Sequence, residues 1–260
     1  MTASWLCVLG FCTGLHAAAW GAFKDSPYEG FRWGSYVRSL VIGLTVAAAL
    51  SATPWGAGLD VLLLIGLLYA AERLTTEWWK TFVRHDDQSA YSIPMRLVYR
   101  GRPVESRTLR YVLGSGVALG LVGSGWILSN TASFLTHWSW GAQILLGGLG
   151  GWLTACGGAW KDAPIEGFSG WKFMRSPLVA TAWAIPLSHF THNPVVLVLS
   201  AGGFAVASVE TYKSFLTGGR APGKFATKVI RFDYPACRYV SAVVHLTLWV
   251  GVAMTLASGV

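Results

Sequence analysis

The stretch WLCVLGFCTGLHAAAWGAFKDSPYEGF, residues 5–31, contains the two features from which the fold is predicted. Its first part, Trp5 to Phe23, is almost entirely apolar and has the length that crosses a hydrocarbon core of about 30 Å. Its last part, Lys24 to Phe31, is a charged motif that occurs again at Lys161 to Phe168. The first feature indicates a membrane protein, and the second indicates an internal duplication.

The composition of the whole chain agrees with the first feature. Of the 260 residues, 53% are hydrophobic and only 12% are charged, whereas soluble domains have about a quarter of their residues charged. We therefore predict an all-α integral membrane protein with eight transmembrane helices. Beyond Trp5 to Phe23, the apolar segments are Leu40 to Trp55, Leu59 to Ala71, Tyr111 to Leu128, Trp140 to Trp160, Leu178 to Phe190, Val195 to Val209 and Tyr239 to Ala257.

The charged residues are distributed unevenly between the links. All 20 lysine and arginine residues follow the first, third, fifth or seventh apolar segment, and Asp60 is the only charge in the other links and the termini. The positive-inside rule then predicts cytoplasmic basic loops and two outer termini, and a bacterial inner membrane is expected because no eukaryotic targeting signal is present. The net charge of +8 is explained by topology, so nucleic acid is not expected as a partner.

The first apolar segment could be mistaken for a cleaved signal peptide, because Ala17 and Ala19 resemble a cleavage site. No basic region precedes this segment, and the motif that follows it recurs in the middle of the chain. We therefore expect the segment to remain as the first helix.

The duplication extends over three motifs in the same order. The pattern K-D-x-P-x-E-G-F-x6-R-S begins at Lys24 and again at Lys161, and E-x-x-K-[ST]-F begins at Glu77 and again at Glu210. The sequence R-Y-V then occurs at Arg110 and at Arg238. We predict two four-helix repeats, residues 1–130 and 131–260. Because each repeat has an even number of helices, both repeats enter the membrane from the same side. They should therefore be parallel and related by a pseudo-twofold axis along the membrane normal.

The doubled motifs supply the candidate site. If both copies face the cytoplasm near the axis, six carboxylates and six cations gather there. The candidate catalytic residues are Asp25, Glu29, Glu77, Asp162, Glu166 and Glu210, and the candidate substrate-binding residues are Lys24, Arg38, Lys80, Lys161, Arg175 and Lys213. Four of the carboxylates, Asp25, Glu77, Asp162 and Glu210, could hold Mg²⁺ beside the cations, as suits a phosphate or diphosphate head group.

Each motif also has a purely structural interpretation. Lys and Asp at a helix end, a proline that stops the helix and a glycine that permits a turn would form an ordinary interfacial elbow. Glu and Lys three residues apart on a helix could form only an intrahelical ion pair. Against this, ionisable groups at membrane depth usually face the protein interior or a wet cavity.

Three classes of function therefore stay open. The first is an enzyme acting on a phosphorylated lipid or isoprenoid, the second a transporter or lipid flippase, and the third a non-catalytic subunit that scaffolds partners. Because polar residues are few in the outer half, a one-sided site for an amphiphile is favoured over a conduit. Anionic membrane lipids are the expected partners of the site and also of the basic loops at residues 93–104 and 218–231. In the first of these loops, Gly101 predicts a small hairpin.

Other motifs are weak or missing. No Walker pattern, strand-linked G-x-G-x-x-G, C-x-x-C or H-E-x-x-H is present, which argues against nucleotide, zinc and haem sites of these types. Gly116 with Gly120, and Gly147 with Gly151, have the small-x-x-x-small spacing that lets helices approach closely, so we expect packing at both pairs.

Overall fold

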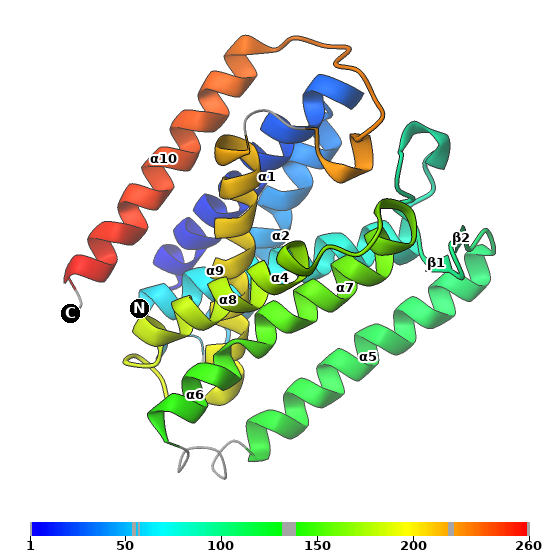
Figure 1. The fold of residues 1–260 in the computed structure, drawn as a ribbon. Helices are drawn as coiled ribbons and strands as arrows, with labels where there is room; N and C mark the ends of the chain where they lie inside the picture. Colours follow the sequence, from blue (N-terminus) through cyan, green and yellow to red (C-terminus); the bar gives the residue numbers. More distant parts are fainter. Residues whose placement is uncertain (1, 54–55, 57, 132–138, 218–220, 259–260) are drawn as a thin grey trace.

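The computed structural model is helical throughout most of its length, and it describes residues 2–53, 56, 58–131, 139–217 and 221–258 (Figure 1). Each of the eight apolar segments is helical over most of its described length, as predicted for an all-α protein. The helices of the first half are α1 (Ala3–Glu29), α2 (Trp33–Ser51), α4 (Val61–Trp78) and α5 (Arg107–Thr131). Those of the second half are α6 (Trp140–Gly147), α7 (Leu149–Glu166), α8 (Gly170–Leu187), α9 (Pro194–Thr211) and α10 (Pro235–Ser258).

Four of the described helices are long and apolar enough to cross a membrane. They are α1, α2, α10, and α9 together with the π-helical turn η4 (Tyr212–Leu216) that continues it. This is consistent with an integral membrane protein. The helices α4 and α7 have 18 residues each and contain charged residues near their C-terminal ends, which lowers their apolar character.

The fifth apolar segment, predicted as one helix from Trp140 to Trp160, is two helices. The helix is interrupted at Gly148, between α6 and α7. A Cβ atom on Gly148 would lie 2.5 Å from Thr181 Oγ1 of α8. Glycine permits this close approach, and three further glycines lie beside it in the sequence. The apolar pattern alone could not locate the break, because the residues on both sides of Gly148 are apolar or glycine.

The prolines of the duplicated motif do not stop their helices, and that part of the prediction was wrong. The helix α1 continues through Pro27 to Glu29, and α7 continues through Pro164 to Glu166. Close to the C-terminal end of a helix, a proline removes only the one hydrogen bond that its own N–H would donate, and its φ is compatible with the helix. Gly30 and Gly167 end the two helices, with φ of 80° and 81°. The predicted glycine turn is therefore confirmed.

The helices α4 and α9 pack against each other at the centre of the bundle, while α5 and α10 lie at its opposite edges (Figure 1). The central contact is close: Ser200 Oγ donates to the Leu63 carbonyl at 2.8 Å, and a Cβ atom on Gly203 would collide with the Gly66 carbonyl. Packing at glycines is also observed for Gly147 and Gly151. At Gly116 and Gly120, a Cβ atom would meet no described residue within 4 Å, so the expected packing is not found within the described part of the chain.

The loop after α4 forms a small structure across one end of the bundle. It begins with the π-helical turn η1 (Trp79–Val83) and includes the predicted hairpin, β1 (Val98–Tyr99) paired antiparallel with β2 (Arg102–Pro103). Tyr91 and Met95 of this loop pack against Phe225 in the 3-10 turn η5 (Gly223–Phe225), and Tyr28 of α1 joins them. The loops of the two halves therefore meet over the end of α1.

Candidate functional site

A cavity of about 360 Å³ lies where the charged ends of six helices meet. It is lined from the C-terminal ends of α1, α4, α7 and α9 and the N-terminal ends of α2 and α8. Eleven of the twelve residues predicted for the site line this cavity: Lys24, Asp25, Glu29, Arg38, Glu77, Lys80, Lys161, Asp162, Arg175, Glu210 and Lys213. The exception, Glu166, pairs with Lys172 instead. The first two doubled motifs are thus brought together at one end of the bundle, whereas Arg110 and Arg238 of the third motif do not line the cavity.

Glu210 is the most deeply buried carboxylate among the predicted site residues. Its side chain is only 3% exposed, and it forms ion pairs with Lys24 of α1 and with Lys213, the latter at 3.0 Å. A charge so far from water needs compensation, which two ammonium groups supply. Glu210 therefore ties α9 to α1 across the cavity.

Glu77 has a similar arrangement but is more open to water. Its side chain is 31% exposed and lies 3.3 Å from Arg73, 3.1 Å from Lys80 and 3.8 Å from Lys161. The predicted intrahelical pairs, Glu77 with Lys80 and Glu210 with Lys213, are therefore present. Each glutamate, however, also binds the motif lysine of the other half of the sequence, which spacing along one helix could not predict.

Two arginines of the cavity differ from its other cations. The guanidinium of Arg38 stacks over Trp79 at 5.0 Å, and that of Arg175 stacks over Tyr212 at 5.3 Å. Both Nε atoms are buried without a hydrogen-bond partner. Among the described residues lining the cavity, these are the only Lys or Arg side chains with no carboxylate oxygen within 4.0 Å. Their charges are thus uncompensated by ion pairs.

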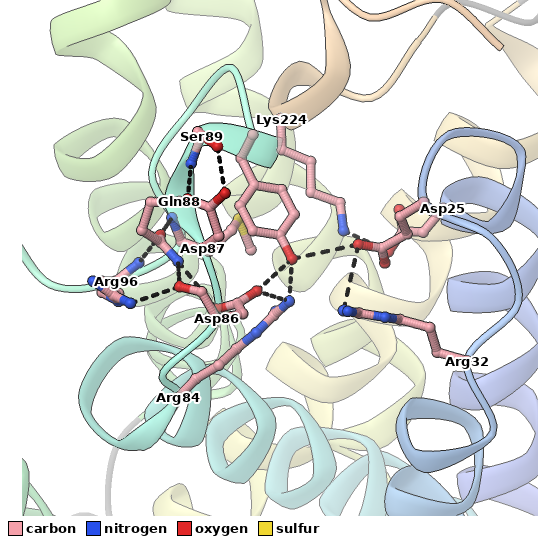
Figure 2. Close-up of polar contacts among 12 residues, drawn as sticks. Asp25, Arg32, Arg84, Asp86, Asp87, Gln88, Ser89, Arg96 and Lys224 are labelled. Atoms are coloured by element: carbon pink, nitrogen blue, oxygen red, sulfur yellow. Dashed lines mark hydrogen bonds and ion pairs between the residues drawn. The ribbon is translucent and has the colours of Figure 1, made fainter. Parts of the chain in front are cut away.

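A network of polar side chains from the loops includes the cavity-lining residues Arg84 and Lys224 (Figure 2). Lys224 points to Asp25, with Nζ and Oδ2 2.6 Å apart, and Arg84 pairs with Asp86. Tyr91 donates a hydrogen bond to Asp86 Oδ2 at 2.7 Å, and its burial together with this bond raises the pKa of the phenol. The loops are therefore held to α1 by charge as well as by aromatic packing.

Several cavity residues were not predicted from the sequence. Arg73, Arg84, Lys172 and Lys224 lie outside the matched motif positions, and the basic residues near Lys224 were interpreted only as lipid-attracting. Glu72 was also missed as a site residue. Its side chain is buried, and its Oε1 accepts hydrogen bonds from Ser39 Oγ at 2.7 Å and Thr76 Oγ1 at 2.9 Å. The depth of Glu72 along its helix was the one signal in the sequence.

The charges of the cavity favour an anion over a metal ion. Among the described residues, eleven Lys and Arg side chains and six Asp and Glu side chains line it, an excess of five positive charges. Within the described part of the chain, no three His, Cys, Asp or Glu side chains lie close enough to hold a metal. The predicted Mg²⁺ ligands Asp25, Asp162, Glu77 and Glu210 pair with lysines instead. These carboxylates do not fit a shared metal site.

No family model, curated protein or solved structure matches this chain. The chemistry of the cavity is therefore the basis for assigning a function. Its geometry provides two stacked guanidinium groups, a positive lining and a position among apolar helices, which together suit an anionic group attached to an apolar molecule.

Proposed function

We propose that the protein acts on a membrane amphiphile, a lipid or an isoprenoid, whose phosphate-bearing head group binds in the cavity. The observation on which this depends is that Arg38 and Arg175 form no ion pair with the described residues, in a cavity whose described lining has five excess positive charges. A planar guanidinium with free donors matches the oxygens of a phosphate group, and an aromatic ring beneath it fixes its orientation. The apolar chain of the ligand remains among the helices or in lipid.

The polar groups at the opposite end of the bundle support an amphiphile rather than a conduit. Asp60 Oδ1 accepts from the Leu62 amide at 2.8 Å, and Asn193 Oδ1 accepts from the amides of Val195 and Val196 at 3.0 and 3.3 Å. Both side chains are therefore N-caps, of α4 and α9 respectively. A flippase would need polar groups at that end that are available to its substrate, whereas these two are occupied in capping.

We also propose that residues 1–130 and 131–260 are two parallel four-helix repeats, so that eight helices cross the membrane with the cavity on the cytoplasmic side. Several matched features support the repeat. The glycines that end α1 and α7 have the same backbone conformation, both E-x-x-K motifs continue into a π-helical turn, and both arginines stack on the first residue of that turn. The caps Asp60 and Asn193 precede the two central helices at the same distance from Glu77 and Glu210.

The cross-half ion pairs are the strongest support for pseudo-twofold symmetry. Lys24 pairs with Glu210, and Lys161 pairs with Glu77, so each motif lysine binds the glutamate of the other half. A twofold axis between α4 and α9 would generate the second pair from the first. The positive-inside rule then orients this end towards the cytoplasm of a bacterial inner membrane.

The proposal is tested by measuring phospholipid binding to the purified protein. In mild detergent with added phosphatidic acid, native mass spectrometry should detect a bound lipid. In the double variant Arg38→Gln with Arg175→Gln, the affinity for this lipid should fall at least about tenfold. Each lost hydrogen bond to a charged group contributes about 1.5–3 kcal/mol. The control variant, Arg107→Gln with Arg238→Gln, removes the same charge outside the cavity and outside both basic loops, and should bind like the wild type. Equal affinities in all three proteins would refute a head-group site in this cavity.

A further inference from the structure

Glu72 differs from every other described carboxylate that lines the cavity. Asp25, Glu29, Glu77, Asp162 and Glu210 each have a Lys or Arg nitrogen within 4.0 Å. Glu72 has none among the described residues, although its side chain is almost fully buried, with 3% of the residue exposed. A carboxylate that is held by two hydroxyl groups and no cation still has acceptor sites for another partner.

The hydrogen bonds of Glu72 leave one of its oxygens available. Both donors, Ser39 Oγ and Thr76 Oγ1, bind Oε1, and the described residues provide no hydrogen bond to Oε2. An ionised carboxylate has about four acceptor sites, so the two hydroxyl groups satisfy only half of them. Because Glu72 lines the cavity, Oε2 is the atom that a ligand can reach.

A free donor lies next to this free acceptor. Arg38 directly precedes Ser39, and its guanidinium interacts electrostatically with Glu72 without forming an ion pair within 4.0 Å. The buried Nε of Arg38 has no partner. One ligand that carries a phosphate oxygen and a nearby hydrogen-bond donor would satisfy both residues.

The surrounding charge decides which donor the ligand carries. The cavity has five excess positive charges, and Arg73 as well as Arg38 interacts electrostatically with Glu72. An ammonium group would be repelled there, whereas a neutral hydroxyl would not. Resting on the head-group function proposed above, we infer that the ligand is a phosphate ester of a polyol, whose hydroxyl donates to Glu72 Oε2 while its phosphate binds Arg38.

The second half of the chain lacks this acceptor. Glu72 precedes Glu77 by five residues, and the residue at the same distance before Glu210 is Ala205, which is buried and apolar. Arg175 therefore has no neighbouring carboxylate of this kind. The head group is thereby oriented, with its hydroxyl towards the first half.

The experiment compares two lipids of equal charge, phosphatidylglycerol, which has head-group hydroxyls, and phosphatidylethanol, which has none. Native mass spectrometry of the full chain should find that phosphatidylglycerol binds about tenfold more tightly, as expected for a hydrogen bond to a charged group. Glu72→Ala, which introduces the residue found at position 205, should lose the preference and bind the two lipids with equal affinity. Glu105→Ala, at a carboxylate that is 74% exposed outside the cavity, should keep the preference.

Each outcome is decisive for one of the two proposals. An unchanged preference in Glu72→Ala, or a preference of the wild type for phosphatidylethanolamine over phosphatidylglycerol, would overturn the polyol assignment while leaving the head-group site intact. Should Glu72→Ala fail to fold, Glu72→Gln keeps the shape of the side chain, and its neutral oxygen should reduce the preference at least about threefold. The head-group proposal itself depends on the Arg38 and Arg175 variants, which are measured separately.

Discussion

The two glutamates of the E-x-x-K motif occupy matching sequence positions but differ in exposure, 3% for Glu210 and 31% for Glu77. Removing one partner of a buried ion pair is much more costly than removing a partly solvated one. We expect Glu210→Gln, which leaves Lys24 and Lys213 unpaired, to lower the free energy of unfolding by about 3 kcal/mol. Glu77→Gln should lower it by about 1 kcal/mol or less.

Unfolding in detergent, monitored by tryptophan fluorescence, measures the loss in free energy of unfolding for each variant. The difference between the variants is the critical quantity, because both substitutions remove one charge from the same cavity. Equal losses of stability would mean that the burial of Glu210 has no energetic consequence.

Gly203 allows the close contact between the two central helices. A side chain there would meet the Gly66 carbonyl and lie 2.8 Å from the Ala70 amide nitrogen, both of them backbone groups that cannot rotate away. Gly203→Ala should therefore destabilise the protein by about 1–3 kcal/mol. Gly120→Ala is the matched control, because the Cβ atom would meet nothing within 4 Å and should leave stability unchanged or slightly higher. Thermal unfolding of the two variants in the same detergent provides the comparison.

At the scale of the helices, the apolar pattern predicted which parts of the chain are helical but not where the helices end. Apolar residues mark the part of a helix that contacts lipid or core, whereas α1 and α4 extend past their apolar parts to include Lys24, Asp25 and Glu77. The charged residues therefore sit on rigid helices instead of in loops. The break at Gly148 was also missed, because it depends on a contact with α8 that no local pattern contains.

The two π-helical turns, η1 and η4, are another feature of the helices that the sequence did not reveal. Each follows directly on a cavity-lining helix and begins with the aromatic residue, Trp79 or Tyr212, that stacks beneath an arginine. Widened turns of this kind are rare and are often found at functional sites. The motif E-x-x-K predicted the charged pair correctly. It could not predict that its aromatic residue stacks beneath an arginine, because these arginines come from other helices, α2 and α8.

At the scale of the whole molecule, the duplication predicted that the twelve candidate residues would gather at one place, and eleven of them share a cavity. Matching motifs must lie at the same depth if the halves are parallel, so this much follows from sequence. The partners within the cavity do not follow, because pairing across the halves depends on how α1, α4, α7 and α9 pack. Within the described residues, each of the four predicted Mg²⁺ ligands pairs with a lysine, and two of these lysines, Lys172 and Lys224, lie outside the doubled motif positions.

The cross-half ion pairs make a prediction about the assembly of the two halves. Residues 1–130 contain Lys24 without Glu210, and residues 131–260 contain Lys161 without Glu77. Expressed separately, each half would bury charges that lack their partners, and we expect little of either to accumulate in the membrane. Expressed together, they should form a one-to-one complex that copurifies. Copurification should fail when Lys24→Glu is introduced, and be regained when Glu210→Lys accompanies it.

The difference between Glu72 and Ala205 has a consequence for the origin of the molecule. A homodimer of identical four-helix subunits has two copies of every side chain, so a carboxylate added beside one arginine is added beside both. Once the subunits are joined in one chain, each can change independently. Under the duplication proposed above, Glu72 is a change that only joined halves permit, because in a homodimer the same carboxylate would lie beside both arginines. The two halves therefore present unequal faces to one cavity.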